Sequence, residues 1–326
     1  MTLKKLVAIA FLFQLSLLGW SQQTFKWSQY LMNTYSLNPA VGGLDGCLVM
    51  NAGYRMQWAG FEDAPRTMMI SGHREVGKEK AYKKGWHGFG ARIFRDTFGP
   101  FEAISIDPSY AYHLKVNKDW VFSAGIFVAF RQYTVNTARI RDNGGIVNEQ
   151  DPVFQGNNVV LTYPIFTPGI WLNNTETQYY FGLSVEQVWR TRMSSWGGNR
   201  IGTDGRLANH YTLITGRRFQ LTGYDMSLEP SILIQYRWLY PPSVDINFRW
   251  HLRQRMAFGV AYRNTEGVVG MIEMQLNQKW RLGYSFDFTT SKIRKGTNLY
   301  THELALRFVH CFKNEPRPNM LCPAYD

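Results

Sequence analysis

The stretch SVDINFRWHL, residues 243–252, decides the fold because its polarity alternates without interruption. Its apolar positions are Val244, Ile246, Phe248 and Trp250, and the polar positions between them are Asp245, Asn247, Arg249 and His251. A period of two predicts a β-strand with one polar and one apolar face. We expect the apolar face to contact lipid and the polar face to line a lumen, although a soluble sandwich also alternates.

The same pattern recurs along most of the chain. Between about residues 46 and 312 it predicts fourteen strands, each near the length that a tilted membrane strand requires. They centre on residues 48–58, 66–76, 87–96, 102–114, 120–130, 166–174, 178–188, 210–221, 225–238, 244–252, 255–264, 267–277, 279–288 and 301–310. No useful helical periodicity and no Pro/Ser linker divides them, so one domain is expected.

The composition of the two faces separates a barrel from a sandwich. One face is large and aromatic, as in Trp280, Tyr284 and Phe288, and the other combines Gly and Ala with charges of both signs. A solvent-exposed sheet favours Thr, Lys and Glu, whereas small and charged residues together suit a crowded barrel interior. The sequence therefore predicts an all-β protein, a transmembrane antiparallel β-barrel of about fourteen strands.

The N-terminus has the composition of an export signal. Lys4 and Lys5 precede an apolar run, Leu6 to Leu18, that is too short for a comfortable membrane helix. We expect a signal peptide at 1–21, an N-terminal segment at 22–45 in the lumen or at the periplasmic mouth, the barrel at 46–312 and a C-terminal tail at 313–326.

Charge and motifs exclude several functions. The formal net charge is +12, which becomes +10 when Lys4 and Lys5 leave with the signal peptide. The arginines are spread singly along alternating strands, which disfavours nucleic acid as a partner. No GxSxG, HExxH or paired-carboxylate motif is present, so we expect no catalytic residues, no cofactor and no metal site.

The chain has 3 cysteines, Cys47, Cys311 and Cys322. This number does not build a disulfide-rich scaffold and gives no metal-ligand spacing. Cys311 and Cys322 are close in sequence and would pair in an oxidising periplasm; a free Cys311 in a strand is an equal alternative.

Two stretches carry a resemblance to a known family. The first is FKWSQYLMNTYSLNPAVGGLDGCLVMNAGYRMQWAGFEDAPRTMMISGH, and the second is FGVAYRNTEGVVGMIEMQLNQKWRLGYSFDFTTSKI followed by THELALRF. They resemble the ends of the PorP/SprF family, outer-membrane proteins associated with type IX secretion and gliding in Bacteroidetes. The matching positions near the N-terminus are Gln29, Tyr30, Asn33, Asn38, Pro39, Ala40, Gly42, Tyr54, Arg55, Gln57, Trp58, Gly60, Phe61, Ala64, Pro65 and Thr67. Those near the C-terminus are Gly283, Tyr284, Ser285, Asp287, His302 and Glu303.

The resemblance implies a barrel in the cell outer membrane that performs no chemistry. Its expected partners are outer-membrane lipid, the C-terminal domain of a secreted surface protein or adhesin, and periplasmic ring or peptidoglycan-binding components. A porin or passive transporter is the alternative function, and a membrane-embedded hydrolase is a third. The tail 313–326 departs from the family pattern, so no function is carried over to it.

The sequence also suggests which residues interact. Arg55, Gln57 and Arg74 are expected to pair with Glu62 or Asp63. Other arginines that point inward are expected to pair with acidic residues inside a narrow lumen. These arginines are Arg237, Arg249, Arg253, Arg263, Arg281 and Arg307. Their expected partners are Asp245, Glu273, Asp287 and Glu303.

Two segments, 139–162 and 190–209, are too long for hairpin turns and are predicted to be extracellular loops. Each carries an aromatic residue among arginines, Phe154 in the first and Trp196 in the second, a combination typical of protein interfaces. Mobile loops that only shield the rim are the alternative.

Overall fold

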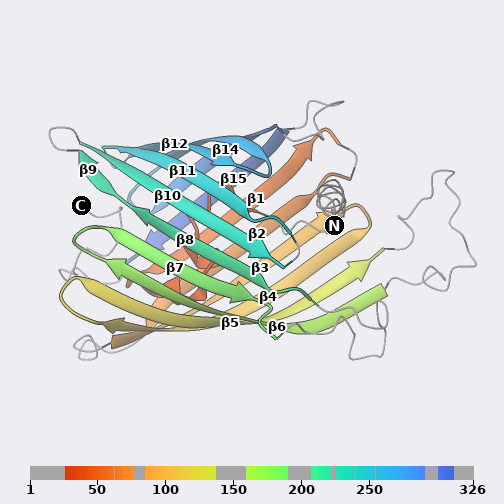
Figure 1. Cartoon of the computed structure of the whole chain (residues 1–326), viewed down its shortest axis with the longest axis horizontal. Helices are drawn as coiled ribbons and strands as arrows, with labels where there is room; N and C mark the ends of the chain where they lie inside the picture. Colours follow the sequence, from red (N-terminus) through yellow and green to blue (C-terminus); the bar gives the residue numbers. More distant parts are fainter. Residues whose placement is uncertain are drawn as a thin grey trace, which may run out of the picture.

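The computed structural model describes residues 26–61, 63–76, 85–136, 159–189, 207–221, 225–238, 240–253, 255–290 and 300–311. The chain forms a single antiparallel sheet that closes on itself (Figure 1). Its first strands are β1 (Leu48–Ala59), β2 (Arg66–Val76), β3 (Gly85–Phe98), β4 (Phe101–Lys115), β5 (Trp120–Val135), β6 (Val159–Asn174) and β7 (Tyr179–Glu186). The remaining strands are β8 (His210–Arg217), β9 (Phe219–Leu221), β10 (Met226–Arg237), β11 (Ser243–Leu252), β12 (Met256–Arg263), β13 (Gly267–Gln275), β14 (Trp280–Thr289) and β15 (Tyr300–His310).

The barrel has a simple up-and-down topology. Each strand pairs with its neighbours in the sequence, and β1 pairs with β15, so that the first and last strands close the wall. Both β8 and β9 pair with β10, and only Arg218 separates them, so they act as one interrupted strand. In the described part of the chain the wall is therefore a closed barrel of fourteen strands, as the sequence predicts.

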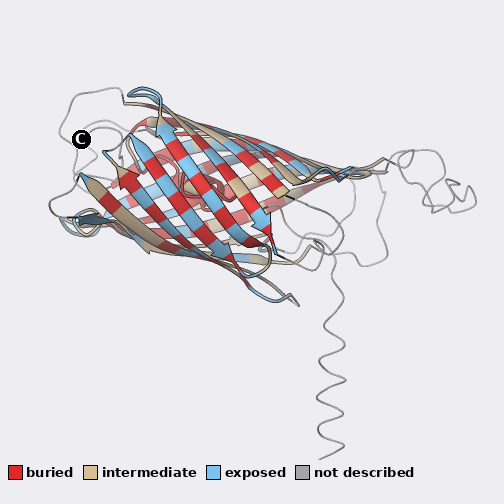
Figure 2. Cartoon of the chain, turned by 90° about the horizontal axis from the view of Figure 1, so that it is seen from above, coloured by how far each residue is buried: buried red, intermediate tan, exposed pale blue. Residues whose placement is uncertain are grey.

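The two faces of the wall differ as the alternation of residues predicts. Along β12 the outward side chains include Val260 and Tyr262, which are 50% and 55% exposed, whereas the inward Ala261 and Arg263 are buried. Figure 2 shows this alternation of buried and exposed residues along the strands. In β11, Phe248 points outward and Arg249 inward, so the predicted orientation of residues 243–252 is confirmed.

β6 begins earlier than the sequence suggested. The predicted strand started at residue 166, but β6 starts at Val159, so the end of the predicted loop 139–162 belongs to the wall. The inward residues Leu161, Tyr163 and Ile165 are apolar and pack with Ala129 of β5. Polarity does not alternate where the lumen itself is apolar, and Pro164 is an unusual strand residue, so the sequence pattern does not predict this part of the strand.

The connections make the two ends of the barrel different. At the end where β1 begins, β4 joins β5 through 116–119 and β13 joins β14 through 276–279; we call this the short-turn end. At the other end, the long-loop end, β5 joins β6 through 136–158 and β7 joins β8 through 187–209. Among the described residues, no helix is long and apolar enough to span a membrane.

The orientation of β11 can be tested at Phe248, which lies near the middle of the strand and is 44% exposed. We expect Phe248→Arg to destabilise the folded barrel by about 2–4 kcal/mol, because a charge near the bilayer midplane loses its hydration. The conservative Phe248→Leu should change stability by less than about 1.5 kcal/mol. Urea titration in lipid vesicles, followed by heat-modifiable gel migration, measures both. Equal stability of the two variants would contradict a lipid-facing Phe248.

Candidate functional site

The lumen is occupied by the N-terminal segment. Residues 26–46, which we call the plug, lie inside the barrel, and Figure 2 shows buried chain within the ring of strands. Tyr30 and Tyr35 are each only 1% exposed, and Ala40 is fully buried. The plug contains two short 3-10 helices, η1 (Thr34–Ser36) and η2 (Pro39–Val41). It runs from the long-loop end, where Lys26 contacts Ser243 and Thr265, to the short-turn end, where β1 begins.

The Asn38-Pro39 sequence shapes the middle of the plug. The Asn38 side chain accepts a hydrogen bond from the Ala40 backbone N–H, which caps η2, and Pro39 supplies the fixed φ of its first residue. The same side chain donates to the backbone carbonyl of Ile170 at 2.8 Å, so it also fixes the plug to β6.

Glycines in the wall make room for this turn. A Cβ atom on Gly125 would approach the Ala40 backbone nitrogen at 2.7 Å, and one on Gly169 would overlap the Asn38 side chain. These close contacts account for small residues on the inward face of β5 and β6.

A buried cluster of charges holds the beginning of the plug. Arg55 of β1 contacts carboxylates from three places in the wall: Asp287 at 2.7 Å, Glu303 at 3.0 Å and Glu266 at 3.3 Å. Arg263 of β12 lies beside it, 2.8 Å from Asp245 and 2.7 Å from Glu266. We call this group the charge cluster; its members are Lys26, Arg55, Asp245, Arg263, Glu266, Asp287 and Glu303.

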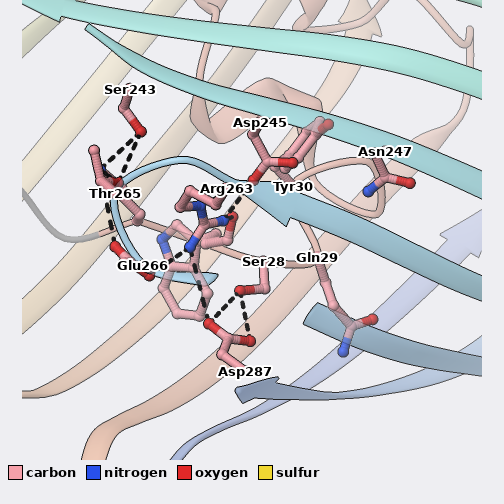
Figure 3. Close-up of polar contacts among 12 residues, drawn as sticks. Ser28, Gln29, Tyr30, Ser243, Asp245, Asn247, Arg263, Thr265, Glu266 and Asp287 are labelled. Carbon is pink, nitrogen blue, oxygen red and sulfur yellow. Dashed lines mark hydrogen bonds and ion pairs between the residues drawn. The ribbon is translucent and has the colours of Figure 1, made fainter. Parts of the chain in front are cut away.

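The plug backbone is bound directly to this cluster. The backbone N–H groups of Ser28 and Gln29 each donate to Glu303 at 2.8 Å. The Ser28 hydroxyl donates to Asp287 at 2.7 Å, as the close-up in Figure 3 shows. Carboxylates that accept from both arginine and backbone N–H groups make strong, directional bonds in a dry environment. The wall and the plug therefore form one electrostatic unit.

The charge cluster shifts the pKa values of two of its members that lie outside the strands, Lys26 and Glu266. Burial lowers the pKa of Lys26 to about 8, although Glu266 at 3.8 Å favours its charged form. Burial opposes ionisation of Glu266, but Arg263, Arg55 and Lys26 outweigh it and lower the pKa of Glu266 to about 2. Glu266 thus stays a carboxylate wherever the barrel is folded near neutral pH.

A second buried pair fixes the centre of the plug. Arg92 of β3 donates from Nε to Asp107 of β4 at 2.7 Å, and it also donates to the Ser36 backbone carbonyl. Its guanidinium lies 4.6 Å from the ring centroid of Phe127. Tyr35 packs edge-on against the same ring, with centroids 5.2 Å apart.

The structure divides the residues singled out from the sequence into two groups. The buried group comprises Gln29, Tyr30, Asn33, Asn38 and Pro39 of the plug, Arg55, which contacts the plug, and Thr67, whose hydroxyl donates to Asp96 of β3. The second group, at the long-loop end of β1 and β2, comprises Gln57, Trp58, Gly60 and Pro65. Phe154 and Trp196 lie outside the described residues, as do the signal peptide 1–21 and the tail 313–326.

The second group lies in or beside a backbone of unusual conformation. Trp58 and Asp63 have φ angles of 55° and 57°, and Gly60 has φ of 100°. The register between β1 and β15 shifts between Met56 and Ala59. Such conformations are costly for residues other than glycine, so the connection from β1 to β2 is a strained segment.

Several expected ion pairs are wrong. Arg55 contacts Glu266, Asp287 and Glu303 instead of Asp63, because its side chain points into the lumen while Asp63 is exposed in the connection. Glu62 lies outside the described residues. Arg74 is exposed and donates to the Glu75 carbonyl, and Gln57 donates its backbone N–H to the Pro65 carbonyl at 2.9 Å.

Most of the inward arginines do have acidic partners. Arg249 lies 3.0 Å from Glu273, and Arg307 pairs with Asp45 of the plug at 3.2 Å. Arg237 lies over the Tyr240 ring, 4.9 Å from its centroid. Arg253 is an exposed residue with φ of 42° in the turn after β11, so its expected place in the lumen is wrong. The alternation ended one residue earlier than the sequence suggested.

The disulfide also differs from the expectation. Cys311 pairs with Cys47 instead of Cys322, which lies outside the described residues. The partners stand just before β1 and just after β15, with Cα atoms 4.4 Å apart, so the bridge joins the strands that close the barrel. Sequence distance pointed to the wrong partner because barrel closure places the two ends of the wall side by side.

Lys26, Glu266 and the Arg92–Asp107 pair were not singled out from the sequence. Glu266 follows β12 in a short turn, and an acidic residue in such a turn is normally expected to be exposed to solvent. Only closure of the barrel brings it beside Arg55. No group of three or more His, Cys, Asp or Glu residues that could hold a metal ion occurs in the described ranges.

Comparison with known proteins identifies a family. The sequence model of the type IX secretion system membrane protein PorP/SprF matches residues 20–308. No curated protein matches the chain.

Three solved structures are similar in fold. The toluene transporter TodX of Pseudomonas putida has 11% identity over 90% of this chain and 96% of its own, with a TM-score of 0.45. The outer membrane protein Omp33 of Acinetobacter baumannii has 6% identity over 81% and 98%, with a TM-score of 0.44. The monoaromatic hydrocarbon channel CymD has 9% identity over 90% and 95%, with a TM-score of 0.49.

The charge cluster can be tested by removing its central cation. Arg55→Met should destabilise the barrel by about 3–5 kcal/mol, because Asp287 and Glu303 would remain buried without their arginine. The matched control is Arg95→Met, which breaks the exposed Arg95–Glu102 pair on β3 and β4 and should cost less than about 1 kcal/mol. Urea unfolding in lipid vesicles gives both values. Similar losses in the two variants would show that the plug is not held by this cluster.

Proposed function

The chain belongs to the PorP/SprF family of type IX secretion system membrane proteins, and we propose that it is a non-catalytic scaffold that receives or anchors a secreted surface protein. As a member, it is an outer-membrane β-barrel component of that secretion system. In bacterial barrels of this kind, short turns face the periplasm and long loops face the outside. We accordingly assign the short-turn end to the periplasm and the long-loop end to the cell surface.

The observation that carries the proposal is the plug. A porin needs an open aqueous lumen, whereas here the plug is joined to the wall by buried charges and hydrogen bonds. Cavities of about 20 Å³ and about 90 Å³ remain beside the plug. A barrel filled in this way suits a rigid platform whose ends bind other proteins better than it suits diffusion.

The strained connection between β1 and β2 is the surface that we propose for the secreted partner. It lies at the extracellular end and contains Phe61, which is 56% exposed. Left-handed residues occur at its start and within it, Trp58 at the end of β1 and Asp63 in the connection, and a backbone hydrogen bond from Gln57 to Pro65 joins its two sides. Strain in a surface loop is maintained where it serves recognition, and an exposed aromatic residue is a frequent interface anchor. The C-terminal domain of a secreted protein is the partner that we propose there.

The periplasmic end would contact the remaining machinery. We propose that peptidoglycan-binding or ring-forming periplasmic components bind the short turns, which connects the surface partner to the cell envelope. The rigid plug, which spans from Lys26 at one end to the start of β1 at the other, supports such a link mechanically.

Affinity purification tests the anchoring role. A tagged copy, solubilised in detergent from the outer membrane, should recover a secreted surface protein and a periplasmic component. Phe61→Ala should weaken binding of the surface protein by about thirtyfold, the loss typical of an interface hot spot, and so reduce its recovery without changing heat-modifiable migration. The control is Trp238→Ala, which removes another exposed aromatic residue, 65% exposed, at the same end.

Two results would count against this proposal. Failure of the unaltered protein to recover any secreted or periplasmic protein would reject the scaffold. Full recovery with Phe61→Ala would move the binding surface away from the connection between β1 and β2.

Conductance separates the scaffold from the porin alternative. In planar bilayers we expect the unaltered protein to give no large, steady single-channel currents, because the plug fills the lumen. A variant lacking residues 26–44, shown to be folded by heat-modifiable migration, should conduct. Steady currents from the unaltered barrel, equal to those of the deletion variant, would favour the porin.

A further inference from the structure

The larger cavity beside the plug is lined by arginines. It measures about 90 Å³ and lies between the plug and the inner face of the wall. Its charged lining residues are Asp45, Arg218, Glu229, Arg249, Arg281 and Arg307. Arg281 is the second residue of β14 and Arg307 lies near the end of β15, so the cavity is at the short-turn end, which we assigned to the periplasm.

Most of these arginines have a close acidic or polar partner. Arg307 donates to the Met32 carbonyl at 2.9 Å and to Asp45 at 3.2 Å. Arg249 lies 3.0 Å from Glu273. These contacts hold the guanidinium groups at the cavity wall.

Arg281 is different. Its one ion-pair contact in the described part of the chain is with Glu273, at 3.8 Å, which is beyond hydrogen-bond length. Glu273 is already bound to Arg249 at the shorter distance. The Arg281 side chain is 16% exposed, so its guanidinium is neither fully hydrated nor fully paired. A guanidinium has five N–H donors in a planar fork that matches carboxylate and phosphate oxygens.

Arginines outnumber carboxylates among the described residues around the cavity. Arg218, Arg249, Arg281 and Arg307 line it, and the carboxylates that line it or pair with these arginines are Asp45, Glu229 and Glu273, so the described residues carry one formal positive charge in excess. Low-dielectric walls strengthen the attraction of that charge for an anion.

We propose that this cavity binds a single small oxyanion, a carboxylate or phosphate group that enters from the periplasm, with Arg281 as its main ligand. The volume far exceeds the roughly 10–15 Å³ that one water needs, and it suits one such group with a few waters. A nucleotide or a folded segment would not fit. The inference rests on the cavity alone, so it stands or falls independently of the scaffold role.

Calorimetric titration of the full mature protein in detergent tests the site. The probes are inorganic phosphate and tri-alanine, with tri-alanine amide as the control that lacks the terminal carboxylate. Ionic strength is kept low and constant, because screening weakens such contacts. We expect saturable binding of one anion per barrel. Binding of phosphate assigns a free anion, and binding of tri-alanine but not its amide assigns the carboxylate end of a protein chain.

Two substitutions make the result specific. Arg281→Gln should weaken binding about tenfold or more, whereas Arg217→Gln, which removes an exposed arginine near the same end of the barrel, should leave it unchanged. Glu273→Gln should tighten binding, since a competing carboxylate is neutralised beside Arg249 and Arg281. Misfolding could not produce that gain. Absence of binding by both anions, or equal affinity in the Arg281 and Arg217 variants, would overturn the proposal.

Discussion

The structure depends on the need to pair charges that the barrel buries. A closed wall of antiparallel strands gives every second residue to the lumen, and in this chain many of those residues are ionised. An arginine such as Arg55, 2% exposed, is stable there only because Asp287, Glu303 and Glu266 converge on it. Those three carboxylates come from two strands and a turn that closure alone brings together. Pairing and closure therefore stabilise each other.

The plug completes that pairing. Glu303 has two oxygens and accepts from Arg55 as well as from the backbone N–H groups of Ser28 and Gln29. Without the plug, the Glu303 carboxylate would lose the two hydrogen bonds that it accepts from the Ser28 and Gln29 backbone N–H groups. The inward glycines follow from the same requirement, since Gly125 and Gly169 leave the space in which the Asn38-Pro39 turn lies. The plug therefore fits in the lumen only because the wall residues that face it at these positions are small.

This arrangement explains which features were predictable from the sequence. Alternation is local, so the strand at 243–252 and its orientation followed directly from Phe248, Arg249 and their neighbours. The pairing of charges is not local. Arg55 was assigned to Glu62 or Asp63 because these are close in sequence, whereas its partner Glu303 is 248 residues away. Cys47 and Cys311, 264 residues apart, were missed for the same reason.

The polarity of the lumen is a consequence of where these charges lie. At the long-loop end, the charge cluster sets Lys26, Arg55 and Arg263 against Asp245, Glu266, Asp287 and Glu303, one formal negative charge in excess. At the short-turn end the balance reverses, with four arginines against three carboxylates among the described residues around the cavity. A filled barrel does not need this asymmetry for stability, since neutral balance at each end would pair the charges more completely. Arginines therefore predominate around the cavity at the short-turn end and carboxylates in the charge cluster at the long-loop end, and the plug runs between the two.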